Sequence, residues 1–197
     1  MLTAGLLCLT VLAIGCVLWM SSDRHGRIDS LPAERIVNEN QAVLRAISLS
    51  CGRGVYFSFV QVVCGLSEEN EYVVNLVPTE SATDPRRLFE RTDAYVLHIV
   101  FGKAQTTVKR LGVPPERLDD QDMCRAAYAA CNHVFQHAHI DGGMQLQIMR
   151  DEQGYTVAFD NLAPTRWAHT RVRLSSDFRV VASVNFQTID WRHLEYG

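Results

Sequence analysis

Hydrophobic positions repeat with two different periods along this chain, and the two periods predict helices and strands. From about residue 31 to residue 50 the apolar side chains fall on one stripe of a helix, which Ser30 caps and Cys51 with Gly52 ends. Residues 55–64 are rich in β-branched and aromatic side chains, which predicts a strand. Residues 71–77 predict a second strand that closes a hairpin with the first.

The stretch from residue 86 to residue 111 carries conflicting signals. The apolar residues between Leu88 and Ile99 follow helical spacing, whereas YVLHIVF at 95–101 taken alone fits a buried strand. Because the length of the stretch favours a helix, we expect a helix over 86–111. Two prolines at 112–116 then break the chain, and a further helix is expected from about residue 120 to residue 137.

Alternation of apolar positions marks the C-terminal third. It runs through residues 144–148, 155–159, 170–174 and 180–186, and it predicts a meander of four antiparallel strands. The expected fold class is therefore α+β, with helices packed on an antiparallel sheet in a single domain at 31–197. A helix followed by antiparallel strands occurs twice in this prediction, at 31–77 and at 120–187.

The first 20 residues contain no charged side chain. Residues 2–20 are about as long as the ~20 residues that a helix needs to cross a bilayer, and they also fit a signal peptide. Small residues at positions 13 and 15 precede Cys16, which resembles the cleavage and lipidation site of a bacterial lipoprotein. We expect residues 1–20 to be a signal peptide or membrane anchor, and residues 21–30 to be a polar tether.

Charge adds two constraints to this picture. The net charge of −3, with both signs well mixed, argues against binding to nucleic acid through a basic field, so no nucleic-acid partner is expected. Arg24 and Arg27 follow the charge-free segment. If that segment is an uncleaved anchor, the positive-inside rule would place the domain in the cytoplasm.

The cysteines favour an oxidising compartment instead. Outside the leader there are four, Cys51, Cys64, Cys124 and Cys131, an even number that fits two disulfides in an exported chain. The local pairs, Cys51 with Cys64 and Cys124 with Cys131, are the first interpretation. A regular helix would hold Cys124 and Cys131 about 10 Å apart, too far for a disulfide. Cross-pairing between the two halves and four free thiols are the alternatives.

The densest polar cluster contains Cys131, His133, His137, His139 and Asp141. His133 and His137 are four residues apart and share a helix face, as zinc ligands can, but the Glu of an HExxH motif is missing. Histidines at the end of a helix also interact favourably with its last carbonyl groups. We therefore expect no metal and no other cofactor. An envelope enzyme that uses this region, with or without zinc, is the alternative function.

Catalytic motifs are otherwise missing from the sequence. A nucleophilic pair of Cys64 or Cys51 with His98 or His169 is conceivable, but no nucleophile elbow surrounds either cysteine. Disulfide formation would also remove the thiol. The chain has no P-loop and no GxGxxG motif. We therefore expect that it is not an enzyme.

Residues 61–65, with the sequence QVVCG, resemble the QxVxG hairpin of cystatins, the protein inhibitors of papain-like proteases. The resemblance covers residues 31–77, and it implies a strand-loop-strand edge that wedges into the groove of a partner. Gln61, Val63 and Gly65 would then be the contacts.

The rest of the chain departs from that family. Cys64 stands where the family usually has a smaller residue. The Pro-Trp pair of the family's second loop has no counterpart, since Pro164 and Trp167 are near each other but not adjacent. Trp167 is a fourth candidate contact. A helix wrapped by an antiparallel sheet, as in cystatin-like and NTF2-like folds, is the architecture that the resemblance implies.

These observations together predict an exported, membrane-associated protein-binding domain without catalysis. It would lie on the periplasmic or extracytoplasmic side of a cell envelope, as an inhibitor, a toxin-immunity protein or an envelope-assembly protein. Its expected partners are another protein and, through residues 2–20, the membrane.

Overall fold

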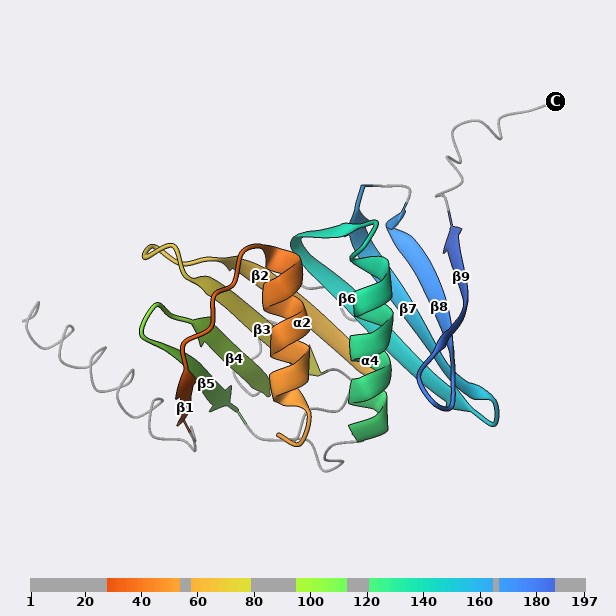
Figure 1. Cartoon of the computed structure of the whole chain (residues 1–197), viewed down its shortest axis with the longest axis horizontal. Coiled ribbons are helices and arrows are strands. Elements are labelled where there is room, and N and C mark those ends of the chain that lie inside the picture. The colour runs from red at the N-terminus through yellow and green to blue at the C-terminus, as the bar shows by residue number, and fades with distance from the viewer. Residues whose placement is uncertain (1–27, 54–57, 79–94, 113–120, 165–166, 187–197) are drawn as a thin grey trace, which may run out of the picture.

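A nine-stranded antiparallel sheet dominates the computed structural model, which describes residues 28–53, 58–78, 95–112, 121–164 and 167–186 (Figure 1). The strands follow one another across the sheet in the order β1-β5-β4-β3-β2-β6-β7-β8-β9, and every neighbouring pair is antiparallel. The elements are β1 (Ile28–Pro32), α2 (Glu39–Ser50), β2 (Phe59–Leu66), β3 (Tyr72–Pro78), β4 (Val96–Phe101), β5 (Gln105–Leu111), α4 (Gln121–Val134), β6 (His139–Asp151), β7 (Gly154–Ala163), β8 (His169–Ser175) and β9 (Val180–Phe186).

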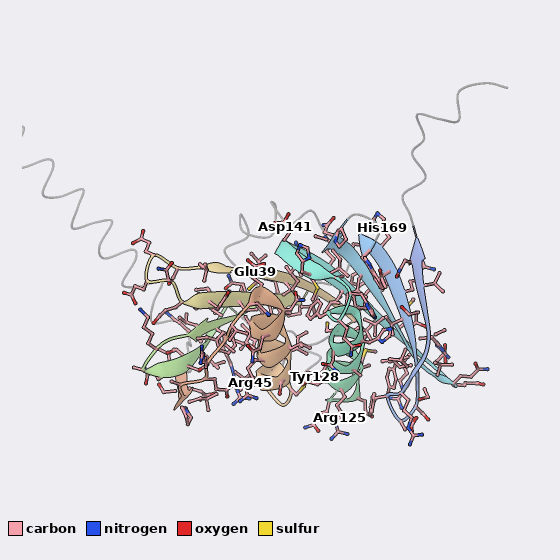
Figure 2. The ribbon with its side chains drawn as sticks, turned by 45° about the horizontal axis from the view of Figure 1, so that its top comes forward. Glu39, Arg45, Arg125, Tyr128, Asp141 and His169 are labelled. Carbon is pink, nitrogen blue, oxygen red and sulfur yellow. A yellow bond between two sulfur atoms is a disulfide. The ribbon has the colours of Figure 1, made fainter. Side chains whose placement is uncertain are left out.

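The two helices of the described residues lie side by side on one face of the sheet (Figure 1). They run in opposite directions, so that Glu39 at the start of α2 and Arg125 near the start of α4 lie at opposite ends of the pair (Figure 2). Small side chains on both helices let the helices approach each other closely. Alternate residues of the strands fill the space between the helices and the sheet. Fully buried residues of this core include Ala42, Ala46, Ile47, Val62, Leu76, Leu97, Ile99, Ala127, Ala130, Met144, Leu146, Val157, Phe159 and Val172.

Each half of the molecule is a helix followed by four antiparallel strands. The first half runs from α2 through β2, β3, β4 and β5, and the second from α4 through β6, β7, β8 and β9. The halves meet where β2 pairs with β6, with Gln61 opposite Gln145 near the middle of the ladder. β1 precedes the first half and pairs with β5 at one edge of the sheet.

The expected α+β class is wrong, because the fold is dominated by the sheet. The predicted helix over 86–111 is wrong over residues 96–111, which form β4, a short turn and β5; its first part lies outside the described residues. Val96, Ile99 and Val100 are β-branched and favour a strand, and alternate residues of β4 are buried in the core on the helix side of the sheet. The local apolar spacing could not show that neighbouring strands of the sheet would pair with this segment.

The first predicted helix begins later than the sequence indicated. Residues 28–32 form β1, an edge strand, where the end of a tether and a helix start were expected. The helix α2 begins at Glu39, and the side chain of Asn38, not that of Ser30, caps it by accepting a hydrogen bond from the Gln41 backbone N–H at 2.8 Å. The predicted leader at 1–20 lies outside the described residues.

Asn40 ties the start of α2 to the end of α4. Its Nδ2 donates to the carbonyl of Ala138 at 2.9 Å and to that of Phe135 at 3.4 Å, and its Oδ1 accepts from the backbone N–H of Ile140 at 3.1 Å. One amide therefore satisfies backbone groups of the turn that joins α4 to β6. Helix ends leave such groups without partners, so this contact replaces a local cap by a long-range one.

Replacement of Asn40 by Ala should lower the free energy of unfolding by about 1–3 kcal/mol, because the Ala138 carbonyl and the Ile140 N–H lose their partner in a partly buried site. Urea denaturation followed by circular dichroism measures the loss. Asn132→Ala on α4, where the side chain is exposed, is the matched control and should change stability little. Equal losses in the two variants would contradict the tie.

Candidate functional site

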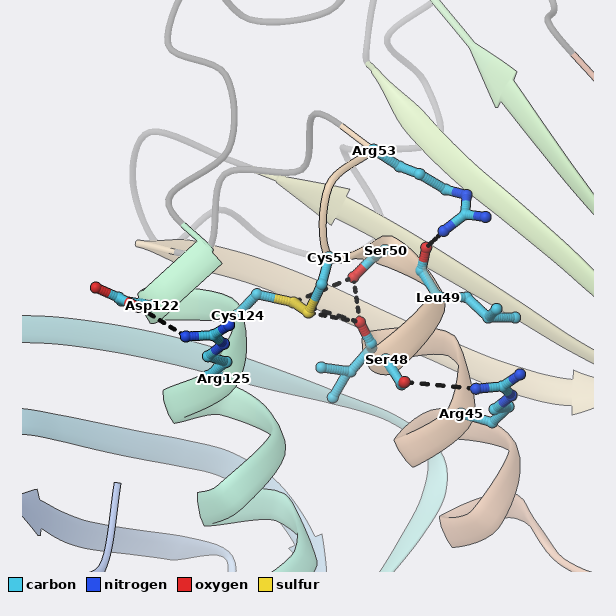
Figure 3. Close-up of a disulfide and its surroundings, with 10 residues drawn as sticks. Arg45, Ser48, Leu49, Ser50, Cys51, Arg53, Asp122, Cys124 and Arg125 are labelled. Atoms are coloured by element: carbon cyan, nitrogen blue, oxygen red, sulfur yellow. Dashed lines mark hydrogen bonds and ion pairs between the residues drawn. A yellow bond between two sulfur atoms is a disulfide. The ribbon is translucent and has the colours of Figure 1, made fainter. Parts of the chain in front are cut away.

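A disulfide between Cys51 and Cys124 joins the end of α2 to the first turns of α4 (Figure 3). The two Cα atoms are 5.7 Å apart, and 73 residues separate the cysteines in the sequence. The carbonyl oxygen of Ile47 lies 3.3 Å from the Cys124 Sγ, and the Ser50 hydroxyl donates to the same carbonyl at 2.6 Å. The disulfide and Asn40 thus hold the helix pair at its two ends.

The local pairing that the sequence first suggested is wrong, and the cross-pairing between the halves is correct for one bond. Cys124 and Cys131 both lie on α4, where two helical turns keep their sulfur atoms apart. Cys64 lies on β2 and is free, as is Cys131, and both are buried. Among the described cysteines there is therefore one disulfide rather than two.

The two free thiols are held in their protonated form. Burial raises the pKa of Cys64 to about 12, and the nearby carboxylate of Glu39 adds to that shift. Burial alone raises the pKa of Cys131. A thiol needs to lose its proton before it attacks a substrate, so neither cysteine has the character of an activated nucleophile near neutral pH.

The structure does not bring the conceivable Cys–His pairs together. Cys64 points to the helix side of the sheet, because it alternates with the buried residues Val60 and Val62 along β2. His98 lies on the other face, beside Asn75, which is directly opposite it on β3. The His98 Nδ1 lies 2.7 Å from the Asn75 Oδ1. Burial, with a smaller contribution from Lys109, lowers the pKa of His98. His169 lies on β8 and contacts Asp160 at 2.6 Å.

The predicted histidine cluster forms an aromatic contact at the end of α4. The rings of His133 and His137 meet edge to face with their centroids 6.2 Å apart, and His137 stacks on Trp167 with centroids 5.4 Å apart and planes inclined by 13°. His139 is exposed at the start of β6. Within the described ranges, no three His, Cys, Asp or Glu side chains are placed to hold a metal ion. Cys131 is buried in the core rather than exposed beside these histidines.

Three of the four candidate contacts lie along β2, on the face of the sheet away from the helices. Gln61 and Val63 are paired on both sides, with β3 and with β6, and Gly65 is paired with Val73 of β3 near the end of the strand. The fourth, Trp167, lies just before β8 in the other half. The structure therefore does not gather the four into one surface.

A cavity of about 450 Å³ opens at the hairpin end of the first half, and we call it the hairpin-end cavity. Three connections build it: the β1–α2 link, the β2–β3 hairpin and the β4–β5 hairpin. Tyr72 and Phe101 lie directly opposite each other on β3 and β4 and form part of its apolar wall. The lining residues are Ala33, Glu34, Arg35, Ile36, Asn70, Glu71, Tyr72, Phe101, Gly102 and Lys103.

Charged side chains of both signs surround this apolar wall. Glu34 forms an ion pair with Arg45 of α2, and a carboxylate oxygen of Glu71 accepts a hydrogen bond from the Lys103 backbone N–H at 3.1 Å. The second contact links the two hairpins. Gly102 occupies a position where a Cβ atom would lie 2.7 Å from the Gln105 carbonyl oxygen, so the tight β4–β5 turn excludes larger residues.

Sequence reasoning missed the hairpin-end cavity because it placed a helix over the second hairpin. A signal was present, since Gly102 and Lys103 interrupt an otherwise apolar and β-branched stretch, which is typical of a turn between strands. The exposed apolar residues Val37 and Leu66 extend from two of the same connections.

Comparisons of this chain with models of known families, with curated proteins and with solved structures found no match. Of the helices in the described part of the chain, none has the length and apolar character that a bilayer span requires.

Removing the disulfide should destabilise the protein strongly. The chain-entropy model gives a loss of about 4 kcal/mol for the double variant Cys51→Ala with Cys124→Ala, because the bond closes a long loop in the unfolded chain. Urea denaturation with and without reductant measures it. The control Cys131→Ala removes a buried thiol from the same helix and should cost about 1 kcal/mol. A double variant no less stable than this control would refute the stabilising role of the bond.

Proposed function

We propose that this chain is a protein-binding domain without catalysis, exported to a cell envelope, and that the hairpin-end cavity receives part of its partner. The observation that carries the proposal is the combination of an apolar wall at Tyr72 and Phe101 with charged groups around it. Pockets that anchor a partner side chain commonly combine these features.

The surface around the cavity favours a protein over a small molecule. Val37 is 63% exposed in the β1–α2 link, and Leu66 is 57% exposed at the end of β2, where the β2–β3 hairpin begins. A small ligand inside the cavity would leave these side chains in water, whereas a protein that covers the rim would bury them. Arg35 and Lys103 would then face acidic groups of the partner.

The state of the thiols supports a role without catalysis. Cys64 and Cys131 are buried and protonated, and Cys51 and Cys124 are joined to each other. The Cys64 thiol and the His98 ring lie on opposite faces of the sheet, so they do not form a nucleophile with its base.

Two features support a location outside the cytoplasm. Disulfides persist in oxidising compartments and are rare in the cytosol, and the bond between Cys51 and Cys124 closes a long loop of this chain. The charge-free stretch at 2–20 has the length and composition of a signal peptide or anchor. Inhibition, toxin immunity and envelope assembly are the roles that fit such a domain.

Site-specific photo-cross-linking in cells that express the full chain tests the binding surface. A photoreactive residue at Leu66 or at Lys103 should give one discrete adduct with another protein, because both positions lie at the hairpin end. The same residue at Met149, which is 46% exposed on β6, is the control and should give none. Lys103→Glu should weaken the Leu66 adduct. No adduct from the hairpin end, or equal adducts from all three positions, would refute this surface.

The location is tested separately by trapping thiols with an alkylating reagent in intact cells before lysis. Mass spectrometry should then recover the peptides that contain Cys51 and Cys124 joined by their disulfide, and the peptides of Cys64 and Cys131 without one. Recovery of Cys51 and Cys124 as alkylated thiols would contradict export while leaving the binding surface untouched.

A further inference from the structure

The strand β9 ends the sheet with an exposed apolar edge. Within the described ranges no strand pairs with β9 on the side away from β8. Val180, Val181 and Val184 are 40%, 66% and 50% exposed, and the strand contains no charged residue and no proline. Natural sheets protect their edges with charges, prolines, bulges or covering segments, because free backbone N–H and C=O groups otherwise recruit another strand. The apolar side chains of β9 are therefore unusual for an edge that stays in water.

The opposite edge of the sheet is protected in the way that β9 is not. β1 contains Pro32, which has no backbone N–H to donate. Its Asp29 forms ion pairs with Arg53 and Arg110 at 3.7 Å and 3.9 Å. The two edges lie at opposite ends of the molecule (Figure 1). A contact of β9 with β1 of the next molecule would build an open filament, and the protection of β1 opposes it.

We propose that β9 pairs antiparallel with β9 of a second copy of this chain, which closes a symmetric dimer with one continuous sheet. Only an extended strand can satisfy the backbone groups of a sheet edge, so the edge selects the conformation of its partner. Self-pairing consumes both free edges at once and leaves only the protected β1 edges outside. The same kind of contact already joins the two halves of this chain, where β2 pairs with β6.

Charge permits this self-pairing. Because β9 carries no charged residue, two copies bring no like charges together in the ladder. The nearest arginines on the neighbouring strand are Arg171, opposite Val184, and Arg173, whose guanidinium binds Asp151 at 2.6 Å. Three strand spacings would separate the two β8 strands by about 14 Å, which exceeds the Debye length of about 8 Å at physiological ionic strength.

A bulge locates the segment that is free to pair. The register between β8 and β9 shifts at Val181, which is the extra residue on β9 between the pairs made by Val180 and Ala182. From Ala182 to Phe186 the register with β8 is continuous. This continuous part offers the regular ladder for a second copy, and it lies far across the sheet from the hairpin-end cavity. The dimer therefore does not depend on the function proposed for that cavity.

Two measurements on the purified protein test the dimer. Light scattering should give a mass that approaches twice the 22.2 kDa of one chain as the concentration rises. Hydrogen exchange should show that amides of residues 182–186 become more protected over the same range, while amides of β1 do not change.

Val184→Glu should raise the dissociation constant of the dimer about tenfold or more, because it places a charge in each pairing edge. Val184 is 50% exposed, so the substitution places the new carboxylate in water and leaves the buried core unchanged.

Ile28→Glu on β1 is the matched control, since Ile28 is 57% exposed on the other edge strand and lies opposite Lys109. It should leave the dimer unchanged. A monomer at every concentration would overturn the proposal, and so would a dimer whose β9 amides gain no protection. Loss of the dimer in Ile28→Glu but not in Val184→Glu would assign the contact to β1 and would equally refute it. The test on the unsubstituted protein stands even if Val184→Glu folds poorly.

Discussion

The antiparallel contact between β2 and β6 is the interaction on which the rest of the structure depends. Each half of the chain is a helix with four strands, and this contact joins the two sets of strands into one sheet. It also decides where the helices go, since both must cover the same face and lie side by side with opposite directions. Burial of the apolar side of the central strands follows from that arrangement, with Val62 of β2 and Leu146 of β6 near the centre of the core.

The contacts between the helices follow from this geometry. Opposite directions bring the end of α2 beside the start of α4, where Cys51 and Cys124 form their disulfide, and bring the start of α2 beside the end of α4, where Asn40 binds the backbone. One end is thus joined covalently and the other by hydrogen bonds. The hairpin-end cavity lies in the first half, where connections of unequal length leave an apolar hollow beside Tyr72 and Phe101.

The candidate site shows which part of a surface local patterns reveal. The sequence correctly predicts that Gln61, Val63 and Gly65 belong to a hairpin of two strands. Pairing with β3 and β6 nevertheless places Gln61 and Val63 inside the sheet rather than at the tip of that hairpin. The cavity instead combines residues from three connections far apart in the sequence. No short motif encodes such a combination, because each connection is an ordinary turn until the sheet aligns it with the others.

The sequence alone determined the local elements: the strands at 144–186 through their alternation, the helix near 121–134 through its apolar stripe, and the four cysteines available for pairing. Tertiary structure decided that residues 96–111 form two strands, since hydrogen-bonded pairing with neighbouring strands outweighs local apolar spacing. It also chose Cys124 as the partner of Cys51, because a disulfide requires Cα atoms within about 7 Å and only the packed helices achieve that distance. Local periodicity reports which face of an element is buried, and the packed structure decides what buries it.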